Sequence, residues 1–317
     1  MRIVSTLASG TEIVAELGLH DHLVGISHEC DHPPDLQDRP RVSRPRFDPD
    51  GLTSGEIDEA VRRAMVDHGS VYAVDGDLIE KLGPDLILTQ AVCEVCAVPT
   101  AGVKDLVRQR GLEARVLSLD AHTVEEILLS VEEVGRATGV EARALERTGA
   151  IRRRLEAVRK SVAGSPRPRV LAIEWLDPPF APGHWVPEMI EIAGGDNLVG
   201  EAGEPSREIG WPALADLDPD VLIVMPCGYG LEAAREDANR HSRRLLEVAP
   251  RAVETGRAFT VDASAYFNRS GPRFVTGVEI LAGLFHPDGF TAPEAATAAA
   301  TAAREWRPAG PSGPSSP

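Results

Sequence analysis

The sequence predicts an α/β protein made of two lobes, each built around a parallel sheet, with a ligand cleft between the lobes. One phrase occurs twice, at residues 82–89 and 217–224, where a Pro-Asp turn precedes a short apolar run. Such runs are typical of strands that are buried on both faces of a parallel sheet. The two copies lie about 135 residues apart, a period that indicates duplicated lobes and not a solenoid of short repeats.

Composition limits the function classes. The 317 residues are 43% hydrophobic and 26% charged, which is ordinary for a soluble globular protein with room for two domains. The net charge of -16, without a cluster of Lys and Arg interleaved with aromatic residues, argues against nucleic acid or an anionic membrane as the main partner. No apolar run reaches the roughly 18 residues that a membrane span requires, and no signal region precedes the first strand. We therefore expect a cytoplasmic protein.

Residues 1–122 are expected to form the first lobe. Besides the strand in the first phrase, apolar runs predict strands at 3–4, 23–27 and 114–119 and a helix at 103–110. A further helix, ending at Gly18, follows the first strand, and Ser9 or Thr11 is expected to cap it. Its free N–H groups would then face the cleft, ready for a polar ligand group. Residues 39–51 are rich in Pro and Arg, which indicates an irregular loop.

Residues 123–164 have helical periodicity with a break at Gly139, and they predict a helical linker that includes a long charged helix at 141–160. The second lobe is expected at 165–307. Its predicted strands are at 170–175, 221–225 and 258–261, and helices are predicted at 186–193 and 273–284. The tail at 308–317 consists mainly of Pro, Gly and Ser, so we expect it to be disordered.

Four thiols follow predicted strands. The two-residue gap between Cys93 and Cys96 would allow both sulfurs to bind one ion, and Cys30 and Cys227 come from neighbouring loops. A four-thiolate site for zinc or an iron-sulfur cluster is one interpretation. Unreactive packing is another, because Cys is among the residue types most often buried. A regulatory disulfide between Cys93 and Cys96 is a third.

Aromatic side chains are scarce, at 4% of the chain, yet they gather after strands of the second lobe. Loops rich in Pro and Gly are poor places to bury indole rings, so these residues predict a platform for a flat ligand, with core packing as the alternative. Three histidines on such loops, His28, His32 and His184, could each serve as a ligand to a metal, and His184 ranks first. The predicted platform residues are Trp175, Trp185, Tyr229, Tyr266 and Phe267.

Arg269 and Arg273 bracket a Gly-Pro turn at the start of a helix. They are predicted to contact an amide or phosphate group of the ligand, with helix capping as the alternative. No Ser-His-Asp order, phosphate-binding loop or Gly-x-Gly-x-x-Gly motif is present, so the sequence offers no direct support for catalysis.

Several motifs together resemble a known family. They are the opening run 5–12, the Pro-Asp strands, Glu188 with 193–197, and the run 269–273. In this order they resemble the helical-backbone (class III) solute-binding proteins for cobalamin and iron chelates, with the cobalamin-binding members closest. The resemblance implies two Rossmann-like lobes joined by one long backbone helix. It also implies a corrinoid or metal-chelate ligand, held between the lobes on aromatic side chains, and delivery to an ABC importer.

The chain departs from this family in three respects. We expect it to lack an export signal, and it carries the four thiols. The family docks on its transporter through one acidic residue on each lobe. Asp77 matches the first position, whereas Pro212 falls at the second.

Two functional hypotheses follow. The first is a carrier or sensor, similar to a solute-binding protein, that binds a corrinoid or related metal chelate through the aromatic residues, His184, Ser9, Arg269 and Arg273. The alternative is a cytoplasmic metalloprotein or redox enzyme that holds zinc, iron or an iron-sulfur cluster on its thiols in the same cleft. Function belongs to the site and not to the scaffold, so the fold alone does not choose between them.

Overall fold

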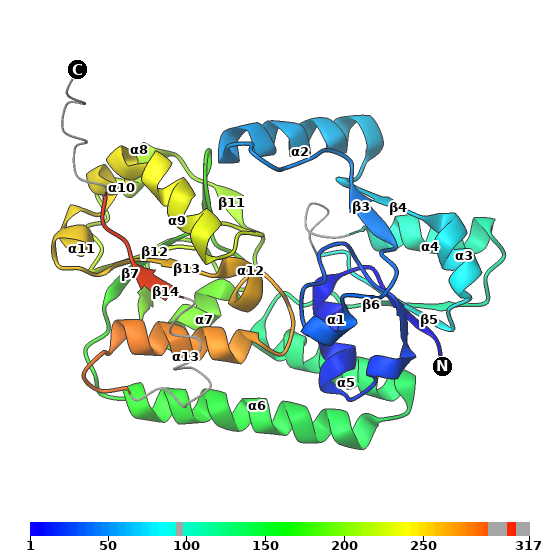
Figure 1. The fold of residues 1–317 in the computed structure, drawn as a ribbon. Coiled ribbons are helices and arrows are strands. Elements are labelled where there is room, and N and C mark those ends of the chain that lie inside the picture. Colours follow the sequence, from blue (N-terminus) through cyan, green and yellow to red (C-terminus); the bar gives the residue numbers. More distant parts are fainter. Residues whose placement is uncertain (93–97, 291–302, 309–317) are drawn as a thin grey trace. The chain divides into compact units, whose positions relative to one another are not determined.

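The structure, a computed structural model, describes residues 1–92, 98–290 and 303–308. The chain divides into two compact units, and each receives a short segment from the other part of the sequence (Figure 1). Unit 1 consists of Met1–Leu52, Glu56–Arg153 and Arg269–Pro272, and unit 2 consists of Thr53–Gly55, Arg154–Asn268 and Arg273–Pro317.

The core of unit 1 is a four-stranded parallel sheet. Its strands are short apolar runs, and all four residues of β5 are buried. Runs of this kind suit a sheet that is covered on both faces. In spatial order the strands are β2 (Leu23–Gly25), β1 (Ile3–Ser5), β5 (Leu86–Thr89) and β6 (Arg115–Ser118).

Alternating residues of β1 and β5 divide the core of unit 1 into two layers. Ile3, Leu86 and Leu88 pack in one cluster with the helices α1 (Ala8–Glu16) and α5 (Val124–Thr138). Val4 and Ile87 pack in the other cluster with α3 (Gly76–Leu82) and α4 (Thr100–Gln109). Both faces of the sheet are therefore covered by helices.

Unit 1 also contains elements that the sequence did not predict. The region expected to be irregular includes β3 (Ser43–Pro45), which pairs in an antiparallel manner with β4 (Tyr72–Val74). The remaining elements are two short 3₁₀ turns, η1 (His20–His22) and η2 (Pro34–Leu36), and the helix α2 (Ser54–His68). The strand β3 was missed because three residues, one of them proline, carry too little apolar pattern.

Unit 2 has a five-stranded sheet in which only the last strand is antiparallel. Residues Val221–Val224 of the second Pro-Asp phrase form its central strand and are fully buried. The antiparallel edge strand, close to the C-terminus, was not predicted from the sequence. The spatial order is β10 (Asp196–Asn197), β7 (Arg169–Ile173), β12 (Val221–Val224), β13 (Ala258–Val261) and β14 (Ala303–Glu305).

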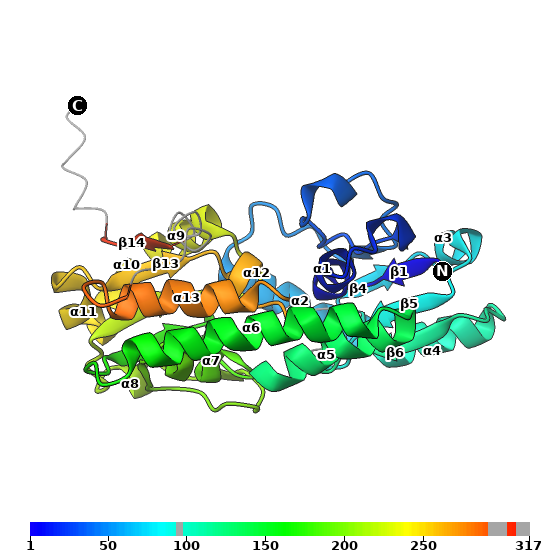
Figure 2. The ribbon, with the colours of Figure 1, turned by 90° about the horizontal axis from the view of Figure 1, so that it is seen from below.

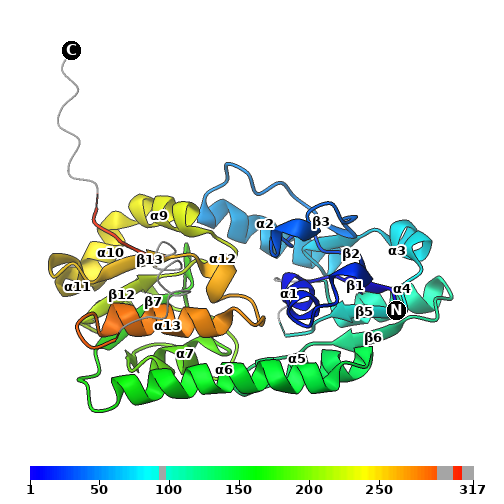
Figure 3. The same ribbon diagram turned by 60° about the horizontal axis from the view of Figure 1, so that its bottom comes forward.

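Helices cover both faces of this sheet (Figure 3). Leu171 and Leu222 pack in one cluster with α9 (Leu231–Arg240), α10 (Ser242–Val248) and α11 (Pro250–Glu254). On the other face lie α7 (Val186–Ile192) and α13 (Phe274–Phe285), which contact each other. The second lobe therefore has the same layered plan as the first.

Unit 2 also contains smaller elements. The three strands β8 (Trp175–Leu176), β9 (Pro179–Ala181) and β11 (Arg207–Glu208) form an antiparallel sheet. Two one-turn helices, α8 (Trp211–Leu214) and α12 (Ala263–Tyr266), complete unit 2. Among the described residues, no helix combines the length and the hydrophobicity that crossing a bilayer requires.

The helical region at 123–164 does not form a separate linker. Helix α5 packs its apolar face into the core of unit 1. It ends at Gly139, whose φ of 76° explains the predicted break. The boundary between the units falls between Arg153 and Arg154, inside α6 (Glu141–Val162). Within unit 2, Arg154 binds Glu279 of α13 at 2.7 Å, and Figure 2 shows these two helices side by side.

The predicted fold class, an α/β protein with two lobes and parallel sheets, is confirmed. The prediction for the start of the first helix is wrong. Helix α1 begins at Ala8 with Leu7 as its N-cap, and no side chain caps it. Ser9 and Thr11 are buried inside the helix. The predicted disordered tail lies outside the described residues, apart from residue 308.

Candidate binding site

The site begins with the topology of the sheet in unit 2. Strand β7 leads to β10 through α7 on one face, whereas β12 leads to β13 through α9 to α11 on the other face. The connections after β7 and β12 therefore diverge, and this is the point where open α/β sheets bind their ligands. The residues that follow the two strands are Glu174 and Trp175 after β7 and residues 225–229 after β12.

Two aromatic rings meet at this point. The rings of Trp175 and Tyr229 have centroids 5.3 Å apart in an edge-to-face arrangement, and both side chains are partly exposed. The Trp175 indole donates a hydrogen bond to the carbonyl oxygen of Asp177 at 3.1 Å. Burial, together with the nearby charge of Asp237, raises the pKa of Tyr229 to about 12. Tyr229 is therefore a neutral hydrogen-bonding group at physiological pH.

The third predicted ring lies on the adjoining segment. The backbone N–H of Ser264 in α12 donates to the carbonyl oxygen of Tyr229 at 3.0 Å, which links the two segments. At the end of α12, the Tyr266 ring lies under the guanidinium of Arg273, whose Cζ is 5.6 Å from the ring centroid. Trp175, Tyr229, Tyr266 and Arg273 are hereafter called the aromatic cluster.

The other two predicted rings are in the interior. Phe267 is completely buried, and Trp185 is 8% exposed. The Trp185 indole donates to the carbonyl oxygen of Phe267 at 2.7 Å, which satisfies its only polar group. Their predicted role as an exposed platform is therefore wrong, because both rings pack as core beneath the loops.

His184 lies between the interior and the surface. It is partly buried, and its ring is 5.7 Å from that of Trp185. Its φ of 52° is unusual for a residue other than glycine. The backbone N–H of His184 donates to Glu204 at 2.6 Å, and its carbonyl oxygen accepts from Gly203 at 2.8 Å. These two bonds hold the backbone of His184 in this conformation.

The sequence reasoning missed the group at the centre of these loops, Glu174. Its carboxylate accepts a hydrogen bond from the Ser206 hydroxyl at 2.6 Å and from the Asn268 amide at 3.2 Å. Burial raises the pKa of Glu174 to about 7, although Ser206, the Gly183 backbone and Asn268 all favour its charged form. The available signal was a single acidic residue directly after the four apolar residues at the end of β7.

In unit 1, the predicted ligand residue Arg269 is bound to carboxylates. Its guanidinium lies 3.1 Å from Glu12 and 2.5 Å from Asp31, and its side chain is only 10% exposed. Ser9, another predicted contact, is 4% exposed, and its hydroxyl accepts a hydrogen bond from Ser270 at 3.3 Å. In this structure both residues hold the segment Arg269–Pro272 in unit 1.

The predicted thiol site is described only in part. Cys93 and Cys96 lie outside the described residues. Cys30 is buried in the core of unit 1, 3.1 Å from the Thr11 hydroxyl, and burial raises its pKa to about 11. Cys227 is partly exposed in unit 2. Across residues 1–92, 98–290 and 303–308, no three His, Cys, Asp or Glu side chains form a group that could hold a metal ion.

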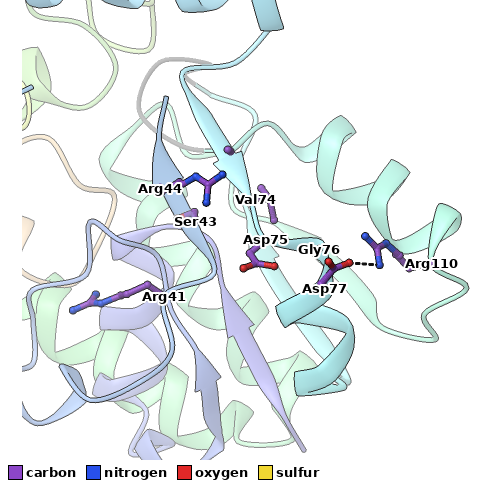
Figure 4. Close-up of a pocket in the computed structure, with 9 residues that line it drawn as sticks. Arg41, Ser43, Arg44, Val74, Asp75, Gly76, Asp77 and Arg110 are labelled. Atoms are coloured by element: carbon purple, nitrogen blue, oxygen red, sulfur yellow. Dashed lines mark ion pairs between the residues drawn. The ribbon is translucent and has the colours of Figure 1, made fainter. Parts of the chain in front are cut away.

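A polar pocket of about 360 Å³ lies in unit 1 beside β3, β4 and the start of α3 (Figure 4). Asp77 is 83% exposed, and it forms an ion pair of 2.5 Å with Arg110, which also bonds Glu80 at 2.9 Å. The carboxylate that the sequence predicts as a docking group therefore stands on the surface beside a cation.

The chain is similar in sequence to known binding proteins. The model of a family described as periplasmic binding protein matches residues 3–265. A cobalamin-binding protein of Halobacterium salinarum is 25% identical over 90% of this chain and 69% of its own length. An uncharacterized ABC transporter substrate-binding lipoprotein of Bacillus subtilis is 23% identical over 91% of this chain and 81% of its own length.

A similar fold is known from crystal structures. A periplasmic heme-binding protein from Pseudomonas aeruginosa superposes with a TM-score of 0.69 at 24% identity, covering 91% of this chain and 93% of the other.

Proposed function

Because the chain belongs to the periplasmic binding protein family, we propose that it binds a flat metal-tetrapyrrole chelate, in the first place a corrinoid, on the aromatic cluster. The observation that carries this proposal is the pair Trp175 and Tyr229, whose rings meet at the switch point of the sheet in unit 2. The similar protein of Halobacterium salinarum is named for cobalamin binding, which supports a corrinoid.

The chemistry of the cluster fits such a ligand. A corrin ring has large apolar faces, which aromatic side chains cover with little loss of side-chain entropy. Its rim carries amide groups, and the hydroxyls of Tyr229 and Tyr266 and the Arg273 guanidinium can bond such groups. The imidazole of His184 offers a nitrogen for axial coordination of the metal. This role of His184 is part of the proposal.

The test is a calorimetric titration of the purified protein with cyanocobalamin, after its own absorption spectrum has been recorded. We expect binding of one ligand per chain with micromolar affinity or better, a free energy of about -8 kcal/mol. Trp175→Ala should weaken binding by about tenfold or more, as expected for an aromatic anchor. The matched control is Trp211→Phe in α8 of the same unit, which should bind like the wild type.

Heme is the second candidate, because the similar solved structure is that of a heme-binding protein. Titration with hemin under the same conditions separates the two ligands. A shift of the Soret absorption band on addition of hemin, together with no heat of binding for cyanocobalamin, would identify heme as the ligand. If neither ligand binds, the proposal of a tetrapyrrole ligand is wrong.

The proposal includes an ABC transporter as partner, since a similar protein is named as an ABC transporter substrate-binding lipoprotein. Asp77 is the proposed docking group of unit 1 because its carboxylate is 83% exposed. In unit 2, the position that the family resemblance assigns to an acid is Pro212, in the first turn of α8. Docking would therefore depend on unit 1 more than on unit 2.

The alternative of a zinc or iron-sulfur protein gains no support. One relative is named for cobalamin binding and one similar solved structure for heme binding, and the raised pKa of Cys30 disfavours the thiolate that metal binding needs. The cytoplasmic location stays a prediction.

A further inference from the structure

We propose that Glu174 is the positioning residue of the aromatic cluster: Glu174 and its partner Asn268 join the segments that carry the three rings, and the charge state of Glu174 affects the surroundings of these rings. The Ser206 hydroxyl and the Asn268 amide donate hydrogen bonds to the Glu174 carboxylate, and the backbone N–H of Gly183 donates to the Ser206 hydroxyl. These three partners come from three different segments of the chain. Glu174 itself immediately precedes Trp175.

The network extends to Tyr229 and Tyr266. The Asn268 side-chain oxygen accepts a hydrogen bond from the backbone N–H of Gly228 at 3.3 Å, next to Tyr229. The carbonyl oxygen of Glu174 accepts from the backbone N–H of Cys227 at 2.9 Å. Asn268 stands two residues after Tyr266. One carboxylate and one amide therefore connect the loop after β7, the loop after β12 and the end of α12.

Among the described residues, no cation forms an ion pair with this carboxylate. Its hydrogen-bond partners are a hydroxyl, an amide and a backbone N–H, and no ion pair involves Glu174 in the part of the chain that the structure describes. Burial without a counter-charge favours the neutral form of a carboxyl group. The titratable or charged groups on the segments that carry Glu174 and its hydrogen-bond partners include Asp177, His184, Glu204, Arg207, Glu208, Cys227, Tyr229, Asp262 and Tyr266.

The charge of Glu174 changes in the physiological range, because burial raises its pKa to about 7. Above this pH the ionised carboxylate is a buried charge that attracts water into the loops. Below this pH the carboxyl group is neutral and does not need water for its stabilisation. The rings of Trp175 and Tyr229 should therefore have different surroundings at pH 6 and at pH 8. This consequence does not require a ligand.

A second consequence rests on the proposed function. A chelate that covers Trp175 excludes water from the neighbouring Glu174, which raises the pKa of Glu174 further. By linkage, the complex then takes up a proton, and the affinity falls as the pH rises above 7. A rise of one pKa unit on binding corresponds to a loss of about tenfold in affinity at high pH.

The first experiment follows tryptophan fluorescence of the ligand-free protein between pH 5.5 and pH 8.5. We expect a transition with a midpoint near pH 7 in the wild type that is absent in Glu174→Gln and in Trp175→Phe. Glu201→Gln, a change of an exposed glutamate in the same unit, should retain it. A transition that persists in Glu174→Gln, or its absence from the wild type, would overturn the proposal.

A further variant protects the test against misfolding of Glu174→Gln. The Ser206 hydroxyl lowers the pKa of Glu174 by its hydrogen bond, so Ser206→Ala should move the fluorescence midpoint to higher pH. A midpoint that stays in place or falls would contradict the role of Glu174.

The second experiment titrates the same variants with cyanocobalamin and hemin at pH 6.5 and pH 8.5. We expect the wild type to bind more weakly at pH 8.5 and Glu174→Gln to bind equally at both. If neither ligand binds while the fluorescence transition occurs as expected, the proposed function fails and the positioning role stands. If a ligand binds and Glu174→Gln keeps the pH dependence, the positioning role fails and the proposed function stands.

Discussion

The guanidinium of Arg269 lies 3.1 Å from the carboxylate of Glu12, a residue 257 positions earlier in the chain. The Glu12 side chain is 2% exposed, so this ion pair is buried. It brings the segment Arg269–Pro272 into unit 1, although its neighbours in sequence belong to unit 2. Arg269 also bonds Asp31 and the carbonyl oxygen of Glu29, so that both terminal nitrogens of its guanidinium are engaged.

Arg269→Met should therefore destabilise the protein. Removing one partner of a buried pair leaves an uncompensated charge, at a cost of about 3 kcal/mol. Urea unfolding followed by circular dichroism measures the loss. The control is Arg108→Met, whose ion pair with Asp105 is largely exposed and should contribute less than about 1 kcal/mol. Equal effects of the two substitutions would show that the buried pair is not a structural anchor.

Glu174→Gln should change how stability depends on pH. The pKa of Glu174 is raised from 4.5 to about 7 in the folded protein, so the unfolded chain loses its proton first as the pH rises. The free energy of unfolding of the wild type should then fall, relative to Glu174→Gln, between pH 4.5 and pH 7 and stay level above. The expected difference is about 3 kcal/mol. Parallel stability curves for the two proteins in urea would refute this prediction.

Cys30 should react slowly with alkylating reagents. Burial raises its pKa to about 11, so only about one molecule in a thousand carries the thiolate at pH 8. Mass spectrometry of iodoacetamide-treated protein measures the extent of modification at each cysteine. Cys227, which is partly exposed, is the internal comparison. Modification of Cys30 at the rate of Cys227 in the folded protein would contradict the burial of its thiol.

Removing the ring of Tyr229 should weaken ligand binding, whereas removing only its hydroxyl group should have little effect. Tyr229→Ala removes the edge-to-face partner of Trp175 and should lower the affinity for the chelate by about tenfold, whereas Tyr229→Phe should change it little. Calorimetry with cyanocobalamin or hemin provides the measurement. Unchanged affinity in Tyr229→Ala would place the ligand elsewhere.

Asp77→Asn should weaken binding to an ABC importer without changing ligand affinity. Asp77 is exposed on α3, away from the aromatic residues in sequence and in a different unit. The measurement is binding of the ligand-loaded protein to a purified importer in nanodiscs. Asp105→Asn, an exposed acid of unit 1 that also pairs with an arginine, is the control. The docking role of Asp77 is wrong if both variants bind the importer like the wild type.

The sequence by itself determined the architecture. The strands β1, β5, β12 and β13 were predicted because buried parallel strands are short, mostly apolar and bounded by turns, a pattern that is visible in the local sequence. The end of α5 was predicted for a similar reason, since Gly139 adopts a left-handed conformation that few other residues tolerate. The repeated Pro-Asp phrase likewise indicated two lobes of one plan.

Only the tertiary structure decided which predicted site residues are accessible. Trp175 and Trp185 stand in the same loop and look equivalent in sequence, yet the second is buried against Phe267, which is 82 residues away. The partners of Glu174 and Arg269 are likewise distant in the chain. Burial and pairing depend on where other segments fold, and local periodicity contains no information about those segments. A group such as Glu174, whose pKa depends on desolvation, therefore becomes recognisable only in the folded protein.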